Sequence, residues 1–166
     1  MEKEFVIYDN VLPKETFENI AQGIIGDGSI PWYYRHNISN RGVEEVGYFT
    51  HMFYCFDEVK IIASDWYYLL EPILNILECK SLIRAKANFY QRTKELHHNK
   101  NHIDYPYIHN GAIFYLNTND GFTVINDEHW IESVENRLLI FNPSVLHRST
   151  HCTNKQYRAN INFNYF

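Results

Sequence analysis

The sequence lacks several features that would assign it to a common class. Its cysteines are odd in number and form no Cys-x-x-Cys pair, which argues against a disulfide framework and a zinc knuckle; they are Cys55, Cys79 and Cys152. A glycine-rich phosphate loop, a charged and apolar leader and an apolar run long enough to cross a membrane are missing too. We therefore expect reduced thiols, a cytoplasmic protein and no membrane association.

Positive charge is also scarce. The chain has 15 Lys and Arg against 20 Asp and Glu, which gives a formal net charge of -5. Surfaces that bind nucleic acid usually neutralise several phosphates with clustered Lys and Arg, so we expect no nucleic-acid partner. The length of 166 residues suits one domain, 1–166, with a real core.

Hydrophobic spacing predicts a first half that contains helices. A short strand is expected at Phe5–Tyr8, and Pro13 is expected to open a helix that Gly26 and the glycine two residues later end. Phe49–Phe56 alternates as a strand does. The apolar positions of Glu58–Leu77 fit a helix, in which Pro72 either produces a kink or opens a second helix.

The second half reads as short strands separated by turns. We expect strands at 82–90, 112–118, 122–125, 130–134, 137–141, 145–149 and 158–165, with a tight turn at Asn119-Asp120-Gly121. This pattern predicts an antiparallel sandwich or barrel. The expected fold class is mostly β with N-terminal helices: a double-stranded β-helix, or jelly roll, at about 82–166, with helical support at about 1–80.

A possible metal site lies in this second half. Two imidazoles and one carboxylate form the facial triad of non-heme Fe(II) oxygenases, which leaves coordination positions open. His102 and Asp104 are two residues apart, so on an extended segment both side chains point the same way. His147 can supply the third ligand from another strand.

Other histidines compete for the distal position. These alternatives are His109, His129 and His151, and His151 lies in the same neighbourhood as His147. The Asn-Pro turn before His147 favours His147. His97 and His98 are interpreted as surface loop residues.

Arg158 follows His147 with ten residues between them and carries a permanently charged fork suited to a carboxylate. It belongs to a polar face of the last expected strand, shared with Asn160, Asn162 and Asn164, while the alternate residues are mostly apolar. A polar face inside a jelly roll indicates a ligand pocket. The alternative is an outward arginine paired with an acid.

Three further motifs accompany these residues: Tyr115-Leu116-Asn117, Gly121-Phe122-Thr123 and Phe141-Asn142-Pro143. From about Ala87 to the C-terminus the chain resembles the Fe(II)/2-oxoglutarate-dependent dioxygenase superfamily. The first two motifs resemble the hairpin of its prolyl-hydroxylase-like branch, although only one glycine is present where that branch has two. The third resembles the turn that delivers the distal histidine.

The resemblance implies a function. It implies Fe(II) held by His102, Asp104 and His147, with 2-oxoglutarate and dioxygen as cosubstrates. Oxidative decarboxylation to succinate would be coupled to oxidation of a substrate, usually hydroxylation. Arg158 would bind the distal carboxylate of 2-oxoglutarate, assisted by the hydroxyl of Tyr115. Further cosubstrate contacts are expected from Asn88, Tyr90 and Asn160.

The primary substrate is less well defined. The hairpin favours a peptidyl or free amino acid, and Trp32, Tyr34 and His51 are candidates for the substrate mouth, with core packing as their alternative. The Arg-x-Asn pattern at Arg158 is similar to that of the nucleic-acid dealkylase branch. Two other classes stay open: a cupin-like metalloprotein that does not use 2-oxoglutarate, and a binding module without iron.

Overall fold

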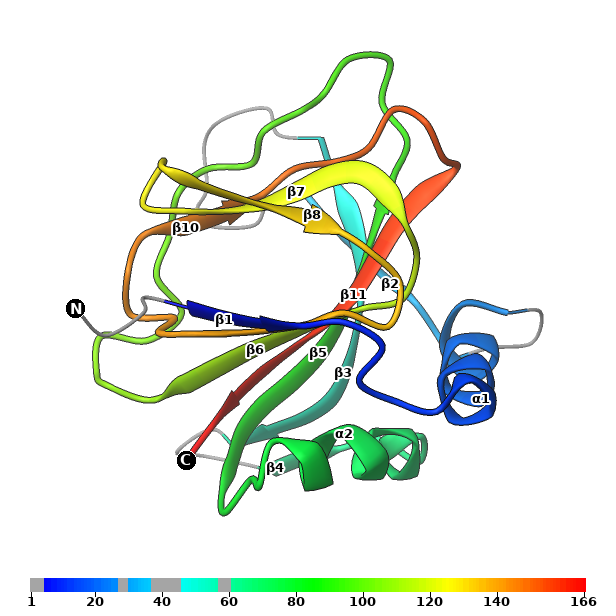
Figure 1. Cartoon of the computed structure of the whole chain (residues 1–166), viewed down its shortest axis with the longest axis vertical. Helices are drawn as coiled ribbons and strands as arrows, with labels where there is room; N and C mark the ends of the chain where they lie inside the picture. Colours follow the sequence, from blue (N-terminus) through cyan, green and yellow to red (C-terminus); the bar gives the residue numbers. More distant parts are fainter. Residues whose placement is uncertain (1–4, 27–29, 37–45, 57–60) are drawn as a thin grey trace.

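The computed structural model describes residues 5–26, 30–36, 46–56 and 61–166 (Figure 1). Most elements are strands, and the two α-helices lie in the first half. In chain order they are β1 (Phe5–Tyr8), α1 (Lys14–Ile25), β2 (Tyr33–Arg35), β3 (Tyr48–Phe56), β4 (Ile61–Ala63), η1 (Tyr67–Leu70), α2 (Glu71–Ile76), β5 (Leu82–Gln91), β6 (Asn110–Tyr115), β7 (Asn119–Ile125), β8 (His129–Ser133), β9 (Leu138–Phe141), β10 (His147–Ser149) and β11 (Tyr157–Tyr165).

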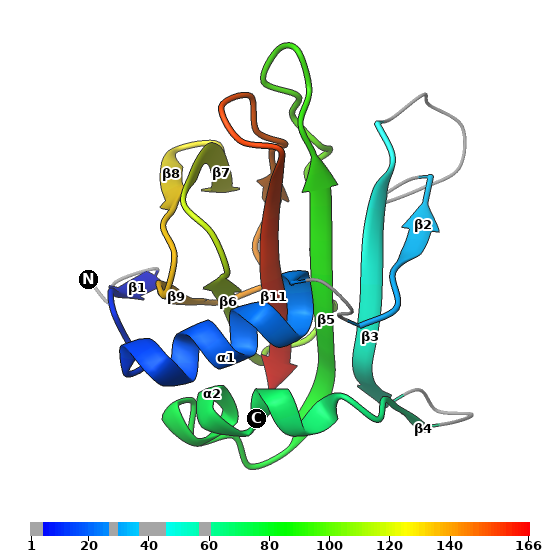
Figure 2. The ribbon, with the colours of Figure 1, turned by 90° about the vertical axis from the view of Figure 1, so that its right-hand side faces the viewer.

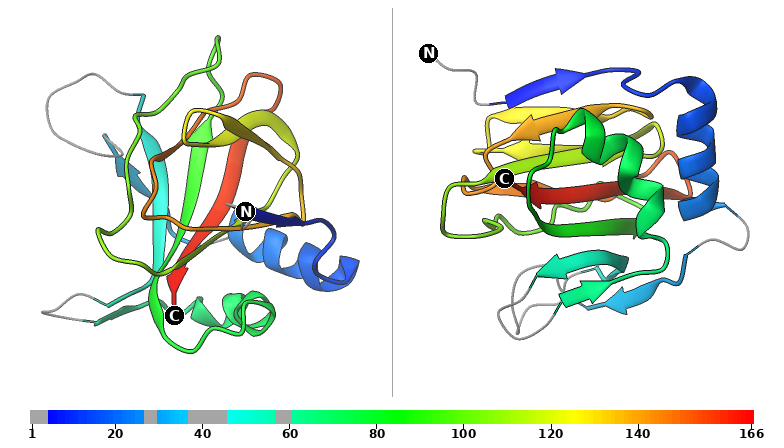
Figure 3. Two further views of the ribbon diagram at one scale, coloured as in Figure 1. Left: turned by 60° about the vertical axis from the view of Figure 1, so that its left-hand side comes forward. Right: turned by 90° about the horizontal axis from the view of Figure 1, so that it is seen from below.

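The strands form two antiparallel sheets that face each other. The large sheet has the order β1-β9-β6-β11-β5-β3-β2, with β4 paired to β3, and the small sheet has the order β10-β7-β8. Figure 1 shows the small sheet opposite one face of the large sheet, while α1 and α2 lie against the other face (Figures 2 and 3). This arrangement is a jelly roll with helices on its outer side, so the expected β-rich fold is confirmed.

The helix-covered face of the large sheet holds the main core. Strand alternation places Ala159, Ile161 and Phe163 of β11 on this face, next to Ala85 and Ala87 of β5. The buried stripe of α1 packs on them through Phe17, Ile20 and Ile24. Small residues at the centre of β5 and β11 provide room for the helix side chains.

The face toward the small sheet is polar along the same strands. Arg158, Asn160 and Asn164 are buried there, and Asn88 lies opposite Asn160 in the register of β5. A smaller apolar cluster fills the remaining space between the sheets; it consists of Ile113, Tyr115, Ile125, Ile131, Leu139 and Phe141. The predicted polar face of the last strand is therefore an interior surface.

The helix predicted at 58–77 is partly wrong. Residues 58–60 lie outside the described residues, and Ile61–Ala63 form β4, which pairs with Tyr54–Phe56 of β3. A helix begins only later, as η1 and then α2, and Pro72 occupies the first turn of α2. Pro72 thus opens a second helix, because its missing N–H is not needed in a first turn. A run of three apolar residues such as Ile61–Ala63 is too short for its hydrophobic periodicity to distinguish a strand from a helix.

The turn predicted at Asn119-Asp120-Gly121 is also wrong. Asn119 and Asp120 begin β7, where the register with β8 shifts before Phe122, and β6 and β7 belong to different sheets instead of forming a hairpin. The carboxylate of Asp120 accepts hydrogen bonds from the backbone N–H groups of Thr153 (2.7 Å) and Asn154 (3.3 Å), so polar residues typical of turns are satisfied in a bulged strand.

The first half is also less helical than predicted. The strand predicted at Phe5–Tyr8 is confirmed as β1, and the helix predicted after Pro13 is confirmed as α1. However, β1, β2 and β3 all join the large sheet, so the segment expected to be helical support supplies part of the jelly roll. No helix in the described part of the chain is both long and apolar enough to span a membrane.

Candidate metal centre and cosubstrate pocket

Two histidines from distant parts of the chain are brought together by backbone pairing. His102, in the long connection between β5 and β6, and His147, at the start of β10, exchange two backbone N–H···O hydrogen bonds of 2.9 Å each. Their rings lie side by side, with centroids 4.5 Å apart. Asp104 is fixed next to them because its backbone N–H donates to the carbonyl of Pro143 at 3.0 Å.

Both imidazoles are oriented in the same way. The Nδ1 of His102 lies 3.2 Å from the carbonyl of Lys100, and the Nδ1 of His147 lies 3.0 Å from that of Val145. A carbonyl accepts only from N–H, so each Nδ1 carries the proton and each Nε2 offers a lone pair. The Nε2 of His147 is buried and has no hydrogen-bond partner in the structure.

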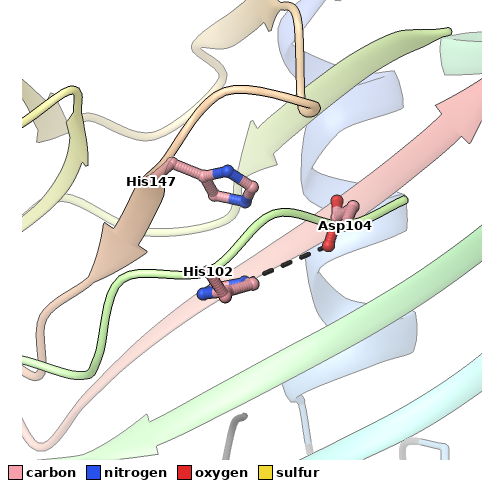
Figure 4. A group of neighbouring side chains, drawn as sticks. All are labelled: His102, Asp104 and His147. Atoms are coloured by element: carbon pink, nitrogen blue, oxygen red, sulfur yellow. Dashed lines mark ion pairs between the residues drawn. The ribbon is translucent and has the colours of Figure 1, made fainter. Parts of the chain in front are cut away.

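One ligand atom from each of His102, Asp104 and His147 lies within 4.8 Å of the other two (Figure 4). We call these three residues the triad. Burial, with His147 nearby, lowers the pKa of His102 to about 4, and burial also lowers the pKa of His147. Both rings are therefore neutral at pH 7, the form that binds metal. Two neutral imidazoles and one carboxylate form the donor set of a non-heme Fe(II) site, so the residues fit this metal.

Two residues of the large sheet hold the Asp104 carboxylate. Arg84 Nη2 donates to Oδ1 at 2.7 Å, and Asn164 Nδ2 donates to Oδ2 at 2.8 Å. Burial is the largest single effect and would raise the pKa of Asp104, but the charge of Arg84, the neighbouring His147 and the hydrogen bonds from Asn164 and Arg84 together outweigh it and lower that pKa. Asp104 is thus ionised and oriented before any ligand binds.

The triad lines a cavity between the two sheets. The other lining residues are Tyr48, Lys86, Asn88, Tyr90, Ile113, Thr123, Arg148, Ser149, Asn160 and Asn162. The cavity encloses about 30 Å³, comparable to the space of one water molecule.

Arg158 lies directly behind this lining and is fully buried. Its Nε donates to Ser133 Oγ at 2.7 Å and its Nη2 to Thr123 Oγ1 at 3.0 Å. Among the described residues no carboxylate forms an ion pair with it, although a buried charge is costly without one. A Cβ at Gly121 would lie 2.5 Å from Arg158 Cδ, so glycine is required there for the arginine to pass.

The other expected cosubstrate residues gather at the same end. The guanidinium carbon of Arg158 lies 5.3 Å from the Tyr90 ring centre and 5.7 Å from that of Tyr115. The Tyr115 hydroxyl donates to Thr123 Oγ1 at 2.8 Å. Asn88 Nδ2 donates to Asn160 Oδ1 at 3.0 Å, while Asn88 Oδ1 is buried without a partner in the structure.

The competing histidines lie away from the triad. His151 Nδ1 donates to the carbonyl of Gln91, and its ring contacts Tyr90 and His97. His109 Nε2 accepts from Asn164 at 3.1 Å, so it supports the group that holds Asp104. His129 packs against Phe5.

The two loop histidines differ from each other. His98 is exposed, as expected of a surface loop residue. His97 is only partly exposed, and its Nε2 is buried, because its ring packs on that of His151.

The residues predicted for the substrate mouth lie elsewhere. His51 pairs with Ala87, on the helix-covered side of the sheet, and its ring nitrogens contact the carbonyl of Pro31 and Ser64 Oγ, each at 2.8 Å. Trp32 packs on Phe89, and Tyr34 is half-exposed beside Phe49. None of the three belongs to the described lining of the triad cavity. For His51 strand parity explains the difference, since neighbouring residues on a strand point to opposite faces.

Sequence reasoning missed three functional candidates on β5 and in the small sheet: Arg84, Lys86 and Thr123. A signal was present for the first two. Arg84, Lys86, Asn88 and Tyr90 alternate with small or apolar residues, as Arg158 and the three asparagines do on β11. Two neighbouring strands with buried polar alternation indicate a shared polar interior.

No protein-family model and no curated protein matches the sequence. Solved structures match its fold. An oxidoreductase of the 2OG-Fe(II) oxygenase family from Burkholderia pseudomallei gives a TM-score of 0.71 at 8% identity, covering 99% of this chain and 85% of that one. A viral collagen prolyl hydroxylase from Paramecium Bursaria Chlorella virus-1, in a 2OG complex, gives 0.62 at 13% identity, with 98% and 96% covered.

A third match is a prolyl hydroxylase from Trichoplax adhaerens, in complex with a peptide fragment of the hypoxia inducible factor oxygen degradation domain. Its TM-score is 0.67 at 14% identity, with 99% of this chain and 84% of that one covered. The chain therefore has the fold of the 2OG-Fe(II) oxygenases, prolyl hydroxylases among them. At such low identity the likeness establishes the fold, and an activity has to follow from the chain's own residues.

Proposed function

We propose that this protein is an Fe(II)- and 2-oxoglutarate-dependent oxygenase. The observation that carries the proposal is the position of Arg158, a buried cation without a carboxylate partner in the described structure, behind the cavity that the triad lines. A metal triad alone suits any cupin-like protein. A cation just behind the lining of the same cavity suits a dicarboxylate that also reaches the metal.

The residues divide the work between them. His102, Asp104 and His147 would hold Fe(II), while Arg84 and Asn164 keep the carboxylate oriented. Arg158 would bind the distal carboxylate of 2-oxoglutarate. Thr123 Oγ1 accepts hydrogen bonds from both Arg158 and the Tyr115 hydroxyl, so these two hydroxyls lie beside the guanidinium. When bound, iron, 2-oxoglutarate and dioxygen supply the oxidation chemistry.

A hydroxylation of a peptidyl or free amino acid is the outcome we propose. The prolyl hydroxylases among the fold matches support this class, and one of them was solved with a peptide. The net charge of -5 disfavours the nucleic-acid dealkylase alternative. A cytoplasmic location is proposed with it, because an Fe(II) centre and reduced thiols both suit a reducing compartment.

Anaerobic titration tests the proposal directly. Fe(II) and 2-oxoglutarate added to the protein should give a metal-to-ligand charge-transfer band, and Asp104→Ala and His147→Ala should abolish it. His151→Ala is the matched control, because His151 is a buried histidine outside the triad. Circular dichroism should show that all variants fold.

Two outcomes would change the proposal. If His151→Ala loses iron while His147→Ala keeps it, the distal ligand is wrong. If iron binds stoichiometrically but 2-oxoglutarate gives no band and no succinate forms in air, the cupin-like alternative replaces the oxygenase.

A further inference from the structure

Lys86 places a cation in the lining of the triad cavity. It points from β5 into the space between the sheets, where it lines the cavity together with the triad. Its Cα is paired with that of Asn162 on β11, one step along the sheet from the pair formed by Arg84 and Asn164. Residues two apart on a strand are separated by about 7 Å, so the Cα of Lys86 lies close to that of Arg84, which holds Asp104 together with Asn164.

The ammonium of Lys86 has no acidic partner in the part of the chain that the structure describes. Its Nζ lies 5.9 Å from the centre of the Tyr48 ring. The charge of Asp104 also acts on Lys86, but that carboxylate forms its ion pair with Arg84. Burial and the charge of Arg84 lower the pKa of Lys86 to about 7. A partly buried lysine that is not paired with a carboxylate lowers stability, and such groups gather at functional sites.

The other cations around the cavity are already matched. Arg84 is paired with Asp104, and Arg148 forms an ion pair with Asp127. Under the proposed function, the distal carboxylate of 2-oxoglutarate balances the charge of Arg158. Asp104 and the other carboxylate of 2-oxoglutarate balance the charge of the metal. Lys86 is the described lining cation for which this assembly provides no anion.

Asn162 supplies a second donor beside Lys86. Its Oδ1 accepts from Asn88 Nδ2 at 3.3 Å, so its own Nδ2 points elsewhere, and among the described residues we find no acceptor for that Nδ2. One ammonium and one amide N–H match the two oxygens of a carboxylate. A phosphate, with more oxygens and up to two charges, would usually call for more donors.

We propose that Lys86 and Asn162 form the anchor for a carboxylate of the primary substrate, so that this substrate is a small carboxylic acid such as a free amino acid. The inference rests on the proposed function and narrows its substrate class. The pair of Lys86 and Asn162 is two residues along the strands from Arg84 and Asn164, which hold Asp104. A carboxylic acid bound there would have the carbon atoms next to its carboxylate close to the triad. An internal residue of a peptide has no free α-carboxylate, so only an aspartate or glutamate side chain could present one.

The first experiment needs neither iron nor the true substrate. Metal-free protein is carbamylated with cyanate, and modification of Lys86 is followed by peptide mass spectrometry. N-acetylglycine and acetate should slow modification of Lys86, whereas their uncharged amide analogues, N-acetylglycinamide and acetamide, should not. Lys94, an exposed lysine in the same digest, is the internal control and should react equally under all conditions.

The second experiment uses the anaerobic Fe(II)·2-oxoglutarate complex. N-acetylglycine should perturb the charge-transfer band in wild type. In Lys86→Met its affinity should fall by at least about tenfold, the loss of one charge-assisted hydrogen bond, and Lys86→Arg should restore most of it. The affinity for 2-oxoglutarate itself should stay within about threefold of wild type in both variants, since Arg158 provides that contact. Lys94→Met should match wild type.

The outcomes separate the two proposals. If the band does not form in wild type, the proposed function fails, while the labelling result still reports on Lys86. If the band forms but carboxylates and amides act alike, or neither acts, the anchor is wrong. Stronger protection by inorganic phosphate than by carboxylates would replace the carboxylic acid with a phosphorylated substrate. Loss of 2-oxoglutarate binding in Lys86→Met would assign Lys86 to the cosubstrate.

Discussion

Strands β5 and β11 carry two unlike surfaces on their alternate residues. Toward the helices they present residues such as Ala85, Ile161 and Phe163, which are packed in the main core. Toward the small sheet they present Lys86 and Asn164, among other polar groups. The backbone is shared, so the difference is produced by strand parity alone.

The two faces are stabilised in different ways. The helix side gains from burial of apolar surface, which needs no particular partner. The cavity side buries polar groups, and each then needs a hydrogen bond or an opposite charge. Most are satisfied, as Asp104 is by Arg84. The exceptions in the cavity lining, where ligands would bind, are His147 Nε2, Asn88 Oδ1 and Arg148 Nε.

Phe163→Ala should have the largest effect and should fall on stability. Phe163 is 1% exposed in the main core, and removing such a side chain costs about 3–5 kcal/mol. Urea unfolding measures the loss. Asn162→Ala, the neighbouring residue on the cavity face, should change stability by less than about 1 kcal/mol. Equal losses in both variants would contradict the contrast between the faces.

Arg158→Met should instead affect ligand binding. Removing one partner of a buried charge pair costs about 2–5 kcal/mol, so the affinity for 2-oxoglutarate should fall by at least about tenfold with little change in iron binding. Titration of the anaerobic Fe(II) complex measures this. Arg92→Ala, at an exposed arginine, is the control. Wild-type affinity in Arg158→Met would remove the support for 2-oxoglutarate.

Lys86→Met should raise thermal stability at pH 7. Since the folded protein lowers the pKa of Lys86 to about 7, the unfolded chain binds the proton more strongly, and wild-type stability is reduced below pH 7. The reduction shrinks as pH rises from 7 toward 10. The melting temperature should therefore increase by a few degrees, about 2–4 °C per kcal/mol, and the gap from wild type should narrow at pH 9. A gap independent of pH would show that the charge is not its cause.

Tyr115→Phe should have the smallest effect of the four. It removes one neutral hydrogen bond, worth about 0.5–1.5 kcal/mol, and Thr123 keeps its contact with Arg158. The affinity for 2-oxoglutarate should fall by less than about tenfold in the same titration. A loss as large as that of Arg158→Met would mean that the phenol, and not the guanidinium, dominates the pocket.

Many strands of the second half were predictable because polar and apolar residues alternate clearly along them. The alternation of Arg158 through Asn164 predicted a strand with one polar face, and the structure confirms that this face is interior. Where the local signal was ambiguous, the predictions failed: Ile61–Ala63 is a strand, and Asn119 begins one. Both segments take their form from a partner strand, which local spacing does not reveal.

The candidate site was predictable in part for the same reason. Chemical type singled out His102, Asp104, His147 and Arg158, since few arrangements explain those residues together. It could not find Arg84 or Lys86, whose relevance depends on facing Asp104 from β5. It also directed His51 to the substrate mouth, where the parity of β3 does not allow it to lie.

The sequence by itself determined which groups could bind a metal and a carboxylate, and that the last strand has two unlike faces. Only the tertiary structure decided which histidine lies next to His102, which cations are paired and which, like Lys86, have no ion-pair partner of their own among the described residues. The reason is physical. Alternation along a strand is a local property, whereas register between strands and the pairing of charges depend on residues far apart in the chain.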